Sequence, residues 1–155
     1  MREQVELREY DQRDLEPMVK LDEACFAPPF RFSRIAMRRF AEAENAWVTV
    51  AERDGEMVGF CIVHREKDGS EDLGYVVTID VTEGSRGEGI GERMLSGGEA
   101  WVRSWQGAGM LLHVFAGNEG AVKFYERMGY ERAEVQRGFY GPGLDAVLYW
   151  KDLLR

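Results

Sequence analysis

The chain has few residues of the kinds that build metal centres, disulfide frameworks or membrane spans. Its 155 residues include two cysteines, Cys25 and Cys61, and two histidines, His64 and His113. Their spacing fits no zinc site, so no metal is expected, and isolated cysteines are typical of reduced thiols in the cytoplasm. No apolar run approaches the roughly 20 residues that a membrane span requires, and the first residues lack the apolar segment of a secretory signal. We therefore expect a cytoplasmic protein with no membrane partner.

Positive charge is also scarce. Lysine and arginine total 20 against 28 acidic residues, which gives a net charge of −8. This balance disfavours a nucleic-acid partner, because such proteins normally carry a basic surface. An acidic surface could attract a cationic acceptor such as an amine, or it could serve solubility alone. The length suits a single domain over residues 1–155 with a core of its own.

The pattern of apolar residues predicts a mixed chain in the order β-α-α-β-β-β-α-β-α-β-β. Asp54-Gly55 between two apolar runs is a strong hairpin signal. Apolar positions recur at helical period over residues 90–105, although Gly97 and Gly98 interrupt that helix. Asn118 is a good N-cap for a helix ending near residue 129.

The most informative segment is a glycine-rich turn between the strand of residues 75–81 and that helix. Its residues are Arg86, Gly87, Glu88, Gly89, Ile90 and Gly91. Glycine lets bare backbone approach a ligand, and the first N–H groups of a helix have no partner within it, so an anion such as a pyrophosphate is expected here. The turn lacks the lysine and hydroxyl of a Walker loop, and its glycine spacing differs from the dinucleotide fingerprint. A glycine turn without a ligand remains the alternative.

An arginine three residues before the first glycine of G-x-G resembles the acetyl-CoA pyrophosphate site of the GNAT acetyltransferases. A second segment, from Asn118 to Tyr130, resembles the N-x-x-A-x-x-F-Y-x-x-x-G-[FY] motif of the same family. The resemblance extends over residues 4–152, and the two motifs stand in the family's order. It implies an α/β (α+β) GNAT fold: a central mixed, mostly antiparallel sheet of roughly six to seven strands flanked by about four helices.

Both ends of the chain resemble one branch of the family, the RimI-like ribosomal-protein-alanine N-acetyltransferases. The similar segments are residues 21–30, 137–140 and 144–147. This branch implies that the acceptor is a protein α-amine, such as the N-terminal alanine of a ribosomal protein. Two alternatives stay open: an acetyltransferase for small amines (a polyamine, an amino acid or an antibiotic), and an acyl-CoA-binding module without turnover. A homodimer is also left open.

The resemblance assigns roles in holding acetyl-CoA. The backbone of Gly87, Gly89, Ile90 and Gly91, with the side chain of Arg86, would bind the pyrophosphate. Val81 would line up with the pantetheine arm, and Asn118 would touch that arm or act only as an N-cap.

The resemblance also assigns the chemistry. Acetyl transfer needs a neutral amine, a polarised carbonyl and a proton for the leaving thiolate. Tyr125 matches the family tyrosine that faces the CoA sulfur and would be the general acid, or it packs beside Phe124. His113 stands where the ribosomal-alanine enzymes have a base glutamate; its ordinary pKa of about 6.5 suits a general base, and a structural histidine is the alternative. Asp80 is the second candidate base. Histone-type relatives place a base glutamate where this chain has Tyr75, which is not expected to serve easily.

Aromatic residues would flank the acceptor. They are Phe30, Phe32, Phe139 and Tyr140. Asp145 would hold either a protonated amine or the closing hairpin, and ordinary packing remains the alternative for each.

Overall fold

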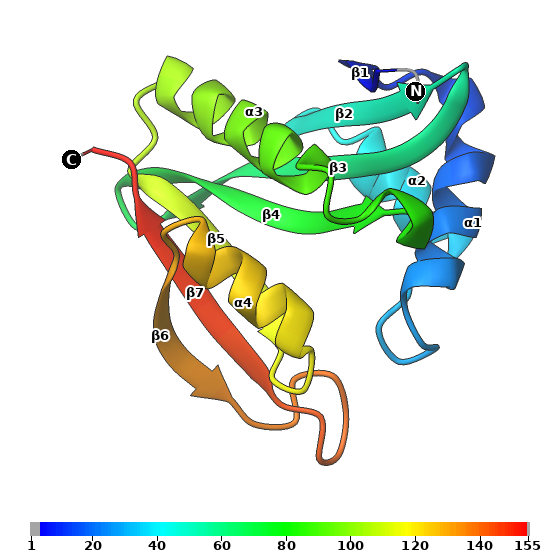
Figure 1. Ribbon diagram of the computed structural model, residues 1–155. Coiled ribbons are helices and arrows are strands. Elements are labelled where there is room, and N and C mark those ends of the chain that lie inside the picture. Colours follow the sequence, from blue (N-terminus) through cyan, green and yellow to red (C-terminus); the bar gives the residue numbers. More distant parts are fainter. Residues whose placement is uncertain (1–3, 155) are drawn as a thin grey trace. The chain divides into compact units, whose positions relative to one another are not determined.

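A computed structural model describes residues 4–154 (Figure 1). In the described residues, seven strands and four α-helices follow one another in the predicted order. They are β1 (Glu6–Glu9), α1 (Leu15–Cys25), α2 (Arg34–Ala41), β2 (Ala46–Arg53), β3 (Glu56–Asp68), β4 (Glu71–Val81), α3 (Ile90–Ser104), β5 (Gly109–Phe115), α4 (Glu119–Arg127), β6 (Glu131–Gln136) and β7 (Ala146–Asp152). Two 3-10 turns, Gln12–Asp14 and Glu83–Ser85, precede α1 and follow β4.

The seven strands form one mixed sheet in the order β1-β2-β3-β4-β5-β7-β6. β4 and β5 run parallel, while β1 with β2, β2 with β3, β5 with β7 and β6 with β7 run antiparallel. The ladder between β4 and β5 pairs Gly74 and Tyr75 with Met110 and Leu111. The predicted fold class and element order are confirmed.

The chain divides into two compact units. Unit 1 comprises Met1–His64 and Val77–Gly98, and unit 2 comprises Arg65–Val76 and Glu99–Arg155. In unit 1, α1 and α2 cover one face of β2 and β3 with a core that includes Met18, Met37 and Phe60. Successive strand residues point to opposite faces, so Gly59 faces the other side, where it lies against Met94 of α3.

Close packing explains the two glycines within α3. A Cβ built at Gly97 would lie 3.2 Å from the Trp47 ring, and one at Gly98 would lie 3.0 Å from Val63. Both distances are tighter than ordinary contacts. The helix therefore gives up helix propensity at these positions so that its backbone can approach β2 and β3.

The predicted hairpin turn at Asp54-Gly55 is confirmed, and local capping contacts precede α1 and α2. Asp11 and Asp14 form a capping box before α1, and Ser33 Oγ accepts from Ala36 N at the start of α2. Asp54 (φ 54°) and Gly55 (φ 77°) form the tight turn between β2 and β3.

β3 and β4 both extend beyond their apolar residues, and β4 begins four residues before the predicted strand of residues 75–81. The extra residues, His64 to Asp68 and Glu71 to Gly74, are mostly polar, so alternation of apolar residues does not reveal them. Within unit 2, Arg65 Nη2 donates to Asp72 Oδ2 at 2.9 Å and its guanidinium lies 4.3 Å from the Trp105 ring. Charge pairing and stacking thus extend the hairpin past the core.

Unit 2 holds α4 against β7 with buried polar contacts. Tyr149 Oη donates to Glu126 on α4, and Lys151 Nζ donates to Met128 O and to the buried carboxylate of Glu99.

Among residues 4–154, no helix is long and apolar enough to cross a membrane.

Candidate active site

The glycine turn lies in unit 1, between the end of β4 and the first turn of α3. Gly87 and Gly89 have φ of +81° and +82°, a backbone conformation that favours glycine. In residues 4–154, a Cβ at Gly87 would meet nothing within 4 Å, and one at Gly89 would meet only Glu92, at 3.9 Å. Backbone conformation, rather than crowding, therefore requires these two glycines. Ile90 and Gly91 begin the helix, whose first N–H groups point out of its N-terminal end.

Arg86 lies beside this turn and is exposed. Its Nε donates to Val81 O at 3.1 Å, and its Nη2 lies 3.5 Å from Cys25 Sγ. These contacts fix the guanidinium between the last residue of β4 and the end of α1. Burial raises the pKa of the Cys25 thiol, so this cysteine lacks the lowered pKa of a reactive thiol.

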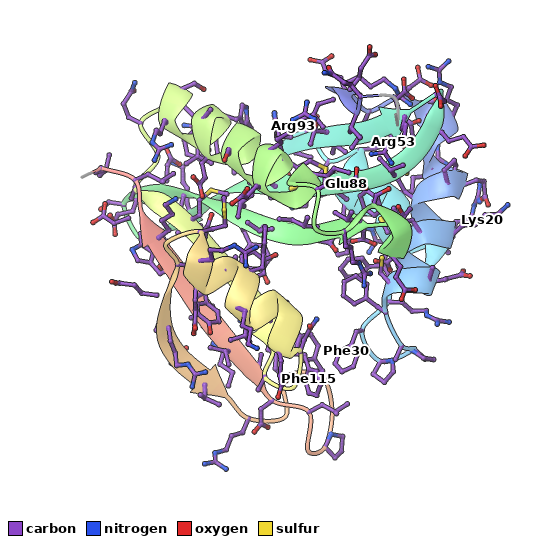
Figure 2. All side chains as sticks on the ribbon, viewed as in Figure 1. Lys20, Phe30, Arg53, Glu88, Arg93 and Phe115 are labelled. Carbon is purple, nitrogen blue, oxygen red and sulfur yellow. The ribbon has the colours of Figure 1, made fainter. Side chains whose placement is uncertain are left out.

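Arg53, at the end of β2, contacts the residues of the glycine turn, and the sequence did not predict this contact. Its Nη1 donates to the hydroxyl of Ser85 at 3.0 Å, and its Nη2 pairs with the carboxylate of Glu88. Figure 2 shows Arg53 and Glu88 pointing toward each other. No motif links an arginine to a glycine turn more than 30 residues later, so only the folded chain reveals this contact.

If the turn binds acetyl-CoA as the resemblance implies, replacing Arg53 with alanine is expected to raise the KM for acetyl-CoA about fivefold to tenfold, or about 1.0–1.4 kcal/mol, because the turn loses charged hydrogen bonds but keeps its own backbone N–H groups. The KM for the acceptor should change little. Lys20→Ala, which removes an exposed cation on α1 of the same unit, is the matched control. Equal KM values for acetyl-CoA in Arg53→Ala and Lys20→Ala would contradict the supporting role of Arg53.

Asp80 is buried in unit 1, with 1% of its surface exposed, and pairs with Asp22, which is 0% exposed. Thr78 Oγ1 donates to Asp80 Oδ1 at 2.6 Å, and Phe32 N donates to Asp22 Oδ2 at 2.7 Å. Among residues 4–154, the two remaining oxygens, Asp22 Oδ1 and Asp80 Oδ2, have no other hydrogen-bond partner, and one proton shared between the carboxyl groups would satisfy both. Burial raises the pKa of Asp80 well above its usual range and also raises that of Asp22.

This pair predicts an unusual stability profile for Asp80→Asn. Because the folded-state pKa of Asp80 is raised, the folded protein binds more protons than the unfolded chain above pH 3.8, and the free energy of unfolding falls as pH rises. Asparagine keeps the contacts with Thr78 and Asp22 but does not ionise. The variant should therefore gain stability over the natural protein as pH rises from 4 to 8, measured by urea unfolding.

Asp72→Asn is the control, because it should change the free energy of unfolding in the opposite direction. The hydrogen bond from Arg65 lowers the pKa of Asp72, so this carboxylate stabilises the fold above its ordinary pKa. Its removal should cost stability at neutral pH and have little effect in acid. A stability difference for Asp80→Asn that stays constant with pH would count against the shared proton.

The second group of predicted residues lies in unit 2 and centres on His113. The Tyr75 hydroxyl lies 2.6 Å from His113 Nδ1, and Gln136 Oε1 lies 2.9 Å from His113 Nε2. The amide nitrogen of Gln136 donates to Glu134, so its oxygen faces the imidazole and accepts from Nε2–H. Nδ1 of His113 is then the acceptor of the Tyr75 hydroxyl proton.

The surroundings favour neutral forms of both partners. Burial lowers the pKa of His113, although Gln136 and the charge of Glu134 act in the opposite direction. Burial raises the pKa of Tyr75 to about 12. At neutral pH, Tyr75 is therefore protonated and His113 is free to accept a proton at Nδ1.

Aromatic rings surround this pair within unit 2. The Phe139 ring stacks on His113 with a centroid separation of 4.1 Å and an interplanar angle of 11°. Tyr140 packs edge-on against Phe139 and Phe115. Burial, with a smaller contribution from Tyr75, raises the pKa of Tyr140 to about 12.

The remaining predicted residues are divided between the units. Tyr125 is buried in unit 2, where its ring contacts Phe124 and Tyr130 edge-on. Asn118 Oδ1 accepts from Ala121 N, which shows the N-cap contact. In unit 1, Phe32 packs edge-on against Phe40, while Phe30 lies in the loop after α1.

The structure thus gathers the predicted residues into two sets. Unit 1 holds Val81, Arg86, Gly87, Gly89, Ile90, Gly91, Asp80, Phe30 and Phe32, and unit 2 holds His113, Tyr125, Asn118 and Tyr140. Their catalytic and binding roles stay predictions. Sequence reasoning did not single out Arg53, Asp22 or Gln136, and it did not predict the contact between Tyr75 and His113.

A model of the Acetyltransferase (GNAT) family matches residues 10–130, which is more than half of the chain. The chain belongs to the GNAT family of acetyltransferases. It is 29% identical over 148 residues to an uncharacterized N-acetyltransferase of Methanocaldococcus jannaschii, covering 94% of this chain and 90% of that protein. It is also 29% identical over 145 residues to an N-alpha-acetyltransferase of Sulfurisphaera tokodaii, covering 87% and 85%.

Other similarities are more partial or concern the fold alone. A mycothiol acetyltransferase of Streptomyces griseus is 40% identical over 88 residues, which are 56% of this chain and 27% of that protein. The ribosomal-protein-S18-alanine N-acetyltransferase of Escherichia coli superposes with a TM-score of 0.85 at 20% identity, covering 97% of this chain and 94% of the other. NAA60 of Arabidopsis thaliana, in complex with acetyl-CoA, gives 0.86 at 22%, covering 98% and 100%. These superpositions place the chain in the GNAT fold.

Proposed function

We propose that this N-acetyltransferase moves the acetyl group of acetyl-CoA onto the α-amine of a protein N-terminus. The observation that carries the acceptor class is the similarity to an N-alpha-acetyltransferase over 87% of the chain. The Tyr75–His113 pair supports the reaction type, because an α-amine arrives largely as ammonium and must lose a proton before it attacks.

The glycine turn fits the pyrophosphate of acetyl-CoA. Gly87 and Gly89 adopt the backbone that a side chain would disfavour, the space over Gly87 is open, and α3 begins directly behind them. Arg86 adds a positive charge beside the turn. The end of β4 at Val81 would lie along the pantetheine arm, and Asn118 would touch it from the start of α4. Bound acetyl-CoA supplies the acetyl group as a thioester.

Tyr75 and His113 would act together as the general base. The Tyr75 oxygen takes a proton from the ammonium, directly or through a water, while its own hydroxyl proton passes to His113 Nδ1. The amine becomes neutral, Tyr75 ends as it began, and His113 carries the charge, with Nε2–H held by Gln136. Asp80 is the weaker candidate, because its carboxyl group is buried and bonded to Thr78 and Asp22.

Tyr125 is proposed as the general acid that gives a proton to the thiolate as it leaves. Its phenol would restore the neutral thiol of CoA as the new amide bond forms, and the tyrosinate would regain its proton from the amide nitrogen, which must lose one. Phe30, Phe32 and Tyr140 are proposed to line the approach of the acceptor.

A small amine is the second candidate acceptor, since the mycothiol acetyltransferase shares 40% identity over 88 residues. That match covers only 27% of the other protein, so it is weaker support than the near full-length relative. A cytoplasmic location, a homodimer and a RimI-like choice of acceptor remain proposals.

Release of CoA thiol from acetyl-CoA tests this function. The acceptors are an alanine-starting peptide, the same peptide with a blocked N-terminus, a polyamine, an amino acid and an aminoglycoside. Release with the free peptide, and none with its blocked form, is the expected result. Release of thiol with small amines alone would show that the acceptor is a small amine and not a protein N-terminus. Binding of acetyl-CoA without thiol release on any acceptor would favour a binding module.

A further inference from the structure

Three contacts fix the His113 imidazole in unit 2. Tyr75 and Gln136 engage its two nitrogens, and Phe139 covers one face of the ring in a parallel stack at 4.1 Å. The hydrogen bonds set the direction of the imidazole in its plane, while the stack closes that face to water. Phe139 is therefore as much a part of the surroundings of His113 as the two residues that bond to it.

Phe139 itself has little to hold it. It is 48% exposed and belongs to the loop of residues 137–145 between β6 and β7, drawn in Figure 1 as a long connection at the ends of these strands. Gly138, Gly141 and Gly143 all have positive φ, and glycine-rich backbone loses much conformational entropy when it is ordered. Something else must order this loop to keep Phe139 on the imidazole.

Asp145 provides that order. Its Oδ1 accepts from the backbone N–H of Gly138, directly before Phe139, at 2.9 Å. Its backbone oxygen accepts from Ala116 N, in the turn after β5, also at 2.9 Å. One residue thus ties the start of the loop to its end and to the strand that carries His113. Within the loop, Tyr140 N donates to Leu144 O, which closes it further.

We propose that Asp145 and Phe139 are positioning residues for His113: Asp145 fastens the loop, and Phe139 closes one face of the imidazole against water. This proposal rests on the proposed function of His113. It also gives Asp145 a role other than binding the substrate amine, because Oδ1 is already used by Gly138 N.

The test is an NMR titration of the His113 imidazole in the intact chain, read beside kinetics. The chain has two histidines, so His113→Gln assigns the resonances. Phe139→Ala should raise the pKa of His113 toward its ordinary value, because water reaches the open face. It should also lower kcat/KM about tenfold and move the acid limb of the pH profile upward. Phe139→Leu, which keeps an apolar cover, should give smaller changes of the same sign.

Asp145→Ala should reproduce the effects of Phe139→Ala, and the double variant should be no worse than either alone, since Asp145 acts through Phe139. Asp145→Asn keeps an oxygen for Gly138 N and should restore most of the natural titration. The titratable groups that act on the imidazole from other elements, Tyr75 and Glu134, and the neighbouring Tyr140 are left in place in every variant.

Two results would overturn the proposal. One is a His113 titration that does not change in Phe139→Ala. The other is a loss of acceptor binding in Asp145→Ala with the His113 titration unchanged, which would assign Asp145 to the amine. The titration needs no substrate, so shifts of the expected sign together with silence toward every acceptor would leave this inference standing and count against the proposed function alone.

Discussion

His113→Ala is expected to lower kcat/KM for acetyl transfer by about 10³-fold, with the KM for acetyl-CoA little changed. General-base catalysis by a positioned side chain typically contributes about 10²- to 10⁴-fold. The variant removes His113 Nδ1, which accepts the hydroxyl proton of Tyr75. Tyr75 can then no longer release its own proton when it takes one from the ammonium. Steady-state kinetics with an α-amine peptide measures the effect. Tyr75→Phe, which keeps the ring and removes the hydroxyl, should lose activity to a similar extent.

His64→Gln is the matched control, because it changes the only other histidine of the chain. His64 Nε2 lies 2.8 Å from the carbonyl oxygen of Phe40 in unit 1, and a glutamine amide can also donate there. Its kcat/KM should stay close to that of the natural protein. Full activity in His113→Ala would move the role of base to another residue.

The same assignment fixes the pH dependence. The base works only when His113 is neutral, and burial lowers its pKa below the ordinary value of 6.5. As far as the protonation of His113 is concerned, kcat/KM should therefore stay constant around neutral pH. It should fall in acid, with the acid limb of kcat/KM below pH 6.5. An acid limb above that value would contradict a buried, neutral imidazole.

Gly89→Ala should raise the KM for acetyl-CoA by about tenfold or more. Alanine at a φ of +82° costs about 1–2 kcal/mol, and the turn can relieve that strain only by moving its N–H groups out of position. Because these groups are proposed to meet the pyrophosphate, binding should suffer more than kcat at saturating acetyl-CoA. Equilibrium binding of acetyl-CoA and steady-state kinetics together measure this.

Gly55→Ala separates strain from binding. Gly55 has a similar φ of +77° in the β2–β3 hairpin, and in residues 4–154 a Cβ there would meet nothing within 4 Å. Both variants should lose a comparable amount of stability, whereas only Gly89→Ala should weaken acetyl-CoA binding. If Gly55→Ala raised the KM equally, general destabilisation would explain the result and the turn would lose its assigned role.

The sequence determined the fold and the glycine turn, because the signals for both are local. Asn118 starts α4 through a contact within a few residues, and this start was predicted. The glycine turn could be predicted because its glycines and the start of the following helix are neighbours in the sequence. The polar ends of β3 and β4 were missed because their pairing does not depend on apolar alternation.

Only the tertiary structure decided the chemistry around His113. The sequence offered His113 and Asp80 as candidate bases and set Tyr75 aside, since residues on different strands carry no sign of their contact. In the folded chain, the hydroxyl of Tyr75 on β4 lies 2.6 Å from Nδ1 of His113 on β5, and Asp80 is buried against Asp22 of α1. Whether a titratable group acts as a base depends on its burial and partners, and these come from residues up to 58 positions apart. Local sequence can name the candidates, but long-range packing sets their protonation.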